Sequence, residues 1–123
     1  MSKSKVALIG WSPDAFDYST WPGLTKEQLK TQLEGDRDSL IALGYDAQLL
    51  YIFGADTAYD TVCKYLREKT FDCIMIGAGV RKVEANFLLF EKVVNAVHAN
   101  APHSKICFNS IPTDTADAIK RWV

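Results

Sequence analysis

The sequence predicts an α/β domain, a three-layer α/β/α sandwich around a four-stranded parallel sheet. Two segments, Lys5–Trp11 and Cys73–Ile76, contain uninterrupted apolar runs, which are typical of parallel strands buried on both faces. Strand-like and helix-like segments also alternate along the chain, and such alternation with short links requires parallel strands joined by right-handed crossovers. A chain of 123 residues is long enough for one core, so residues 1–123 are expected to form a single domain.

The first half of the chain is predicted to contain a strand, a long loop and a helix. The strand Lys5–Trp11 is followed by the loop Ser12–Gly23, which is longer than most strand-to-helix links. Aromatic residues indicate that this loop packs onto the domain: Phe16, Tyr18 and Trp21. Thr25 and Gln28 stand at capping-box spacing, and Gly44 supplies a helix stop. The apolar face of this helix is predicted at Leu29, Leu33, Leu40 and Ile41.

The second half repeats the alternation. Further strands are predicted at Ala47–Phe53, Cys73–Ile76 and Lys105–Asn109. A second helix begins at Asp56 or Thr57. A third helix follows Arg81, with an apolar period formed by Val83, Phe87, Phe90, Val94 and Val97. The last helix lies within Thr113–Val123, and we expect its Ile119 and Trp122 to pack beside the first helix, over the third and fourth strands.

The first and third strands are the most apolar, so we expect them to be the inner ones. This gives the sheet order 2-1-3-4, the flavodoxin-like (Rossmann-like) order without its fifth strand. In that order the connections after strands one and three leave toward opposite faces of the sheet. A crevice is therefore expected between them at the carboxyl edge, which is where open α/β sheets bind ligands.

The residues at this edge predict a binding site for an anion. Two glycines, Gly77 and Gly79, remove side chains where a ligand would approach the backbone, and Arg81 follows two positions later. Its guanidinium suits a carboxylate or phosphate, although a structural ion pair with Asp14 or Asp17, or a charge on the helix face, is the alternative. The ligand-binding residues expected from the sequence are Trp11, Ser12, Asp14, Gly77, Gly79, Arg81 and Asn109.

Composition and motifs narrow the classes of function. The 14 basic and 15 acidic residues give a net charge of -1 without a basic stripe, so we expect no nucleic-acid partner. No apolar run approaches the roughly 20 residues of a membrane span. Cys63, Cys73 and Cys107 stand at neither metal-ligand nor redox-motif spacing, so we expect buried thiols and no metal. Lys82 replaces the third glycine of a dinucleotide fingerprint, and the cofactor stays unassigned.

A resemblance covers nearly the whole chain. It is carried by Gly77–Arg81, Leu89–Glu91, Asn95, His98, Ala101–Pro102, Lys105–Asn109, Pro112–Thr115 and Arg121–Trp122. These residues are similar to those of a group of small single-domain bacterial proteins of unassigned function. The resemblance implies a flavodoxin-like shape and implies nothing about a substrate.

The leading hypothesis is a small cytoplasmic α/β protein that binds an anionic small molecule at the carboxyl edge, and whether it is an enzyme stays open. The alternative is a non-catalytic interaction module that acts by dimerisation or by docking on a partner. The apolar Ile106–Phe108 run in the last strand favours a symmetric homodimer, because bare sheet edges invite pairing. Sedimentation as a monomer at high micromolar concentration would exclude this homodimer.

Overall fold

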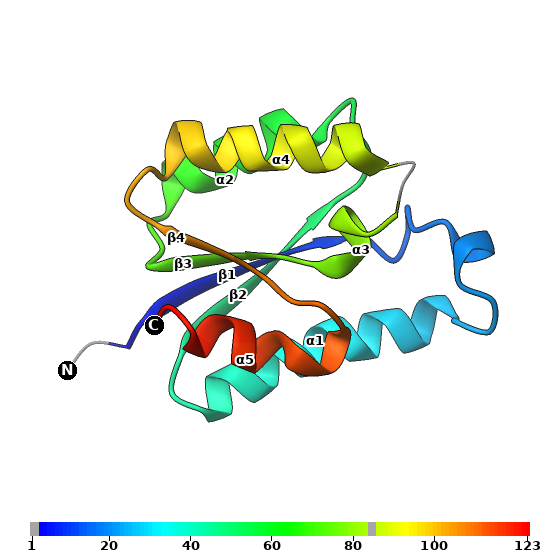
Figure 1. Cartoon of the computed structure of the whole chain (residues 1–123), viewed down its shortest axis with the longest axis horizontal. Helices are drawn as coiled ribbons and strands as arrows, with labels where there is room; N and C mark the ends of the chain where they lie inside the picture. Colours follow the sequence, from blue (N-terminus) through cyan, green and yellow to red (C-terminus); the bar gives the residue numbers. More distant parts are fainter. Residues whose placement is uncertain (1–2, 84–85) are drawn as a thin grey trace.

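The computed structural model describes residues 3–83 and 86–123. Within this part of the chain, four parallel strands form one sheet in the order β2-β1-β3-β4 (Figure 1), which confirms the predicted order. The strands are β1 at Lys5–Trp11, β2 at Asp46–Ile52, β3 at Cys73–Ile76 and β4 at Lys105–Phe108. The two inner strands are β1 and β3, as their apolar sequences predict, and they are buried almost throughout.

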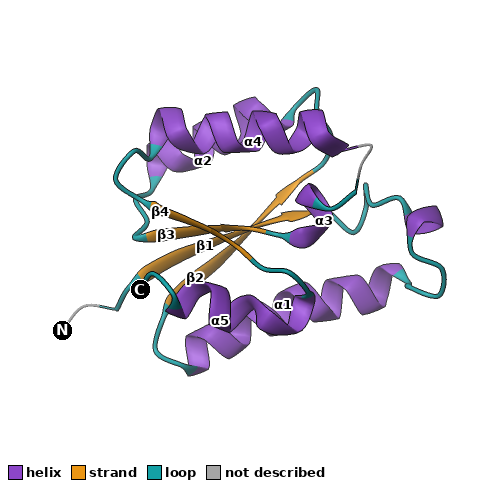
Figure 2. Ribbon diagram, viewed as in Figure 1, coloured by secondary structure: helices purple, strands orange, loops and turns teal. Residues whose placement is uncertain are grey.

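Helices cover both faces of the sheet (Figure 2). One face is covered by α2 and α4, and the opposite face by α1 and α5. The helices are α1 at Lys26–Ala42, α2 at Ala58–Glu68, α3 at Ala78–Arg81, α4 at Phe87–Asn100 and α5 at Thr115–Lys120, with short 3-10 helices η1 at Tyr18–Thr20 and η3 at Pro112–Asp114. Each face has its own apolar core cluster. No helix in residues 3–83 and 86–123 is long and apolar enough to cross a membrane.

Helix α1 begins and ends where its local signals predict. The Thr25 hydroxyl accepts from the Gln28 amide at 3.1 Å, and the Gln28 side chain accepts from the Thr25 amide at 2.9 Å. This reciprocal capping box satisfies donors that the first helical turn would leave unpaired. Gly44 has a φ of 99°, the left-handed conformation expected just beyond a helix end. The predicted apolar face is wrong at Ile41, which is 46% exposed because it stands one position around the helix from the buried Leu40.

The segment after β3 differs from the prediction of one helix. It forms the short helix α3 and then the separate helix α4, which begins at Phe87. The buried residues of α4 are Leu89, Val93, Ala96 and Val97. Phe87 is 64% exposed, and Val83 lies between the two helices. The predicted helical period is wrong at these two positions because it assumed one continuous helix. In two separate helices, the buried face of the second is independent of that of the first.

The last helix lies beside α1 and contacts β3 and β4, as expected. Ile119 is completely buried in the core cluster of this face, but Trp122 is 51% exposed, so its predicted burial is wrong. Helix α5 ends at Lys120, and the helical period therefore no longer determines where Trp122 points. The three cysteines are buried free thiols, in agreement with the expectation of burial.

Candidate functional site

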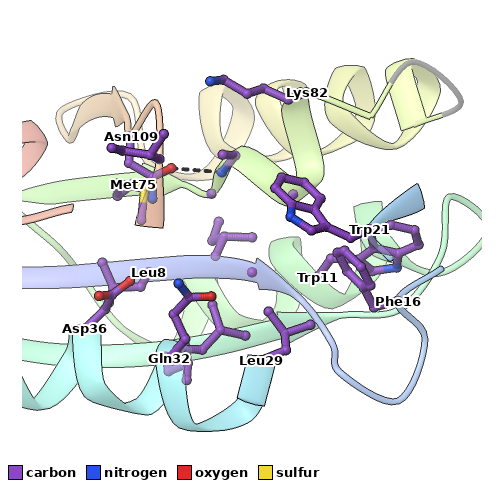
Figure 3. Close-up of a pocket in the computed structure, with 18 of the residues that line it drawn as sticks. Leu8, Trp11, Phe16, Trp21, Leu29, Gln32, Asp36, Met75, Lys82 and Asn109 are labelled. Atoms are coloured by element: carbon purple, nitrogen blue, oxygen red, sulfur yellow. Dashed lines mark hydrogen bonds between the residues drawn. The ribbon is translucent and has the colours of Figure 1, made fainter. Parts of the chain in front are cut away.

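A cavity of about 520 Å³ opens at the carboxyl edge of the sheet. It lies over the ends of β1 and β3 on the face covered by α1, where the strand order predicts a crevice (Figure 3). We refer to it as the edge cavity, lined by Leu8–Trp11, Phe16, Trp21, Leu24, Leu29, Gln32, Leu33, Asp36, Leu49, Met75, Gly77–Gly79, Lys82 and Asn109–Ile111. Most of these side chains are apolar or aromatic, and the polar ones come from α1 and from the segments that directly follow α3 and β4.

Three aromatic rings form one end of the edge cavity. The ring centroids of Trp11 and Phe16 are 4.8 Å apart, and those of Phe16 and Trp21 are 6.5 Å apart. The Trp11 indole is held in place by donating to the carbonyl of Phe53 at 2.9 Å. Phe16 is only 8% exposed, which confirms that the long loop after β1 packs onto the domain. Trp21 also lines the cavity and remains 47% exposed.

A chain of hydrogen bonds joins four elements at the other end of the edge cavity. The Ala78 amide in α3 donates to Oδ1 of Asn109 at 2.8 Å, and Nδ2 of Asn109 donates to the Thr115 hydroxyl at 3.1 Å. That hydroxyl donates to Oδ2 of Asp36 in α1, also at 3.1 Å. We call this chain the polar relay. Asn109 and Thr115 are 6% and 2% exposed, so the relay is a buried element of the fold that ends in a carboxylate at the cavity wall.

Asp36 is the one acidic residue among the described residues that line the edge cavity. Burial raises the pKa of its carboxyl above the ordinary value of 3.8, and the nearby Asp114 raises it further, whereas the hydrogen bond from Thr115 lowers it. The carboxylate is therefore in an environment that disfavours its charge. A ligand group that brings a hydrogen-bond donor or a positive charge to Asp36 would offset the free-energy cost of burying this carboxylate.

Arg81 does not line the edge cavity, contrary to the prediction that it points into the crevice. Its Nη2 donates to the carbonyl of Asn109, and its guanidinium lies 5.5 Å from the ring centroid of Phe108. Ala78 and Lys82 share the cavity face of this turn because they stand four residues apart, and Arg81 is rotated from Lys82 by about 100°. The guanidinium consequently packs on the end of β4, and its buried Nε has no partner among the described residues.

Ser12 and Asp14 hold the turn after β1 instead of lining the cavity. The Ser12 hydroxyl accepts from the Asp14 amide at 3.1 Å, and the Ser12 amide donates to the carbonyl of Ile52 at 2.8 Å. The Asp14 carboxylate forms an ion pair with Lys26, so the alternative pairing of Asp14 with Arg81 is not formed.

Four of the predicted residues do lie together in the lining: Trp11, Gly77, Gly79 and Asn109. Steric crowding explains why position 77 is a glycine, because a Cβ there would lie 3.2 Å from the carbonyl oxygen of Ile9. The same carbonyl accepts from the Gly77 amide at 2.9 Å, so the two backbones are closely joined. Gly77 thus permits the close approach of the chain after β3 to β1.

Gln32 and Asp36 line the edge cavity but were not predicted from the sequence, whereas Lys82 belongs to the turn after β3 that was expected at the crevice. A signal for Asp36 exists in the sequence. Leu29, Leu33, Asp36 and Leu40 follow one another at steps of four, three and four, which places a carboxylate on the apolar stripe of the first helix. A charged residue at such a position must find a buried partner or line a cavity, and Asp36 does both.

Known metal chemistry and known families do not assign this site. No group of three or more His, Cys, Asp or Glu residues that could hold a metal ion occurs in residues 3–83 and 86–123. Comparisons with protein-family models and with curated proteins give no match. The resemblance to small bacterial proteins therefore stays a prediction.

Proposed function

We propose that this protein binds a small molecule with a flat, largely apolar ring in the edge cavity. The observation that carries the proposal is the combination of a cavity of about 520 Å³ with three mutually packed aromatic rings in its lining. Small-molecule sites typically measure about 300–1,000 Å³, are lined by apolar and aromatic side chains, and occur at this edge of α/β sheets. Trp11, Phe16 and Trp21 supply the surfaces on which such a ring would pack.

An anionic substituent on the ligand stays a prediction from the sequence. Arg81 is bound to Asn109 and lies outside the lining, so it does not serve this role in the proposal. Among the described lining residues, Lys82 is the only cation, and its ammonium group donates to the carbonyl of Ser110. The proposal accordingly rests on ring packing and not on a guanidinium–anion contact.

The experiment uses indole as the probe and follows the amide and indole N–H signals of the protein by NMR. We expect saturable shifts at Gly77, Gly79 and Trp21. Trp21→Ala should weaken indole binding about two- to tenfold, because one aromatic contact contributes about 0.5–1.5 kcal/mol. Trp122→Ala is the matched control, since Trp122 is exposed to a similar extent, 51% against 47%, and does not line the cavity.

Two results would contradict the proposal. One is the absence of shifts at these glycines up to the solubility limit of indole. The other is an equal loss of affinity in Trp21→Ala and Trp122→Ala, which would place the probe elsewhere. Arg81→Ala should retain indole binding, because Arg81 does not line the edge cavity.

The second candidate is an interaction module, and we infer it from exposed apolar side chains near the free edge of the sheet. Ile111 and Trp122 are 53% and 51% exposed, and both lie in segments that follow β4. Arg121 donates to the Phe108 carbonyl at 3.0 Å, which covers part of the β4 edge and disfavours strand pairing there. A homodimer through side-chain packing stays a prediction.

A further inference from the structure

We propose that the ligand of the edge cavity carries an N–H donor, an ammonium or amidine-type group, that binds Oδ1 of Asp36. The inference rests on the proposed function and adds the chemical class of the ligand: an aromatic ring at one end and a nitrogen donor at the other. It differs from the expectation of an anion, because the charged group on α1 that lines the cavity opposite the aromatic rings is the carboxylate of Asp36.

The arrangement of side chains gives the cavity two unlike ends. Asp36 and Gln32 project from α1 toward the cavity, while Trp11, Phe16 and Trp21 gather at the opposite end (Figure 3). Gln32 stands one helical turn before Asp36, so both polar groups face the same part of the cavity. A ring packed among the aromatic residues would direct a substituent along the cavity toward this polar pair.

The polar relay determines what Asp36 can accept. A backbone amide is only a donor, so the Ala78 contact places the oxygen of Asn109 toward α3 and its NH₂ group toward Thr115. The Thr115 hydroxyl, which accepts from that NH₂ group, donates to Oδ2 of Asp36. Oδ1 receives no hydrogen bond from any residue in the described ranges. A carboxylate held in this way offers its second oxygen as an acceptor.

Charge favours the same class of ligand. The ion pairs among the described residues join Lys26 to Asp14 and Arg37 to Asp38, and neither involves Asp36. Lys82 is directed to the carbonyl of Ser110. A half-buried carboxylate without a basic partner in the described part of the chain is costly, and a cationic donor from the ligand would offset that cost.

The test compares three probes that share an indole ring and a two-carbon side chain: tryptamine, tryptophol and indole-3-acetate. Their ends are an ammonium, a hydroxyl and a carboxylate. We expect wild-type protein to bind tryptamine about tenfold or more tightly than tryptophol, because both probes can donate to Oδ1 of Asp36 but only the ammonium brings a positive charge to the carboxylate. Indole-3-acetate should bind most weakly. Affinities are measured by calorimetric titration at pH 7.

Asp36→Asn keeps the shape of the side chain and an oxygen for Thr115 but removes the charge. We expect this variant to bind tryptophol as the wild type does and to lose the preference for tryptamine. Asp38→Asn is the control, because Asp38 lies on the same helix with a side chain that is 65% exposed. It should retain the preference.

The outcomes separate this inference from the function on which it rests. Equal binding of tryptamine and tryptophol by the wild type, or strongest binding of indole-3-acetate, overturns the role of Asp36 and leaves ring binding intact. If Asp36→Asn still prefers tryptamine to tryptophol, the role of Asp36 is overturned as well. If none of the three probes binds the wild-type protein, both proposals are wrong.

Discussion

Replacing Asn109 by leucine tests whether the polar relay holds the carboxyl edge together. Leucine has the same branching at Cγ and no hydrogen-bonding group. In the wild type, the Asn109 side chain satisfies the Ala78 amide and donates to the Thr115 hydroxyl, so it joins the start of α3 to α5. The variant removes both contacts from a position that is 6% exposed.

The expected cost follows from these two contacts. The Ala78 amide loses its acceptor, and a buried donor without a partner costs about 1–3 kcal/mol. The bond to Thr115 contributes about 0.5–1.5 kcal/mol. We therefore expect Asn109→Leu to lower the free energy of unfolding by about 1.5–4.5 kcal/mol in total.

The measurement is equilibrium unfolding in urea, followed by circular dichroism. With a denaturant slope of about 2 kcal/mol per molar, the midpoint should fall by about 1–2 M. Asn95→Leu is the matched control. Asn95 is exposed on α4, where its side chain donates to the Glu91 carbonyl at 2.9 Å, so the same replacement should change stability by no more than about 0.5 kcal/mol. Equal midpoints for the two variants would refute the role assigned to the relay.

Two further predictions concern the last helix and the charge of Asp36. Ile119→Ala should lower the free energy of unfolding by about 2–5 kcal/mol because Ile119 is completely buried. Trp122 is half exposed, so Trp122→Ala should lower it by less than about 1 kcal/mol. If urea unfolding shows a larger loss of stability for Trp122→Ala than for Ile119→Ala, Trp122 and not Ile119 is the core residue. The raised pKa of Asp36 lowers the stability of the wild type at pH values above it, so Asp36→Asn should be more stable than the wild type at pH 7, and the difference should shrink as the pH falls through that pKa toward 3.8. The carboxyl of Asp114 raises the pKa of Asp36, whereas its own pKa is lowered by the hydrogen bond from Ser110, so the Asp114→Asn background serves as the control. A difference that grows toward acidic pH would contradict the second prediction.

The amino-acid sequence by itself determined the elements that depend on local chemistry and on burial pattern. The uninterrupted apolar runs of β1 and β3 required central strands, and their position led to the observed sheet order. The capping box at Thr25 and the positive φ at Gly44 likewise depend on residues that are neighbours in the chain. The place of the crevice followed from strand order alone, because a parallel sheet brings the ends of β1 and β3 to one edge.

Tertiary structure decided where individual side chains point once regular structure is interrupted. The guanidinium of Arg81, the last residue of α3, packs on the end of β4 instead of entering the crevice, and Trp122, beyond the end of α5, is half exposed. The sequence predicted a turn at Gly77–Lys82 and did not predict the short helix α3, so it could not give the direction of Arg81 within that helix. The polar relay likewise joins residues as far as 79 positions apart, from Asp36 to Thr115. A carboxylate on the apolar stripe of the first helix is visible in the sequence, but only the packing of α1 against the carboxyl edge makes it a cavity wall.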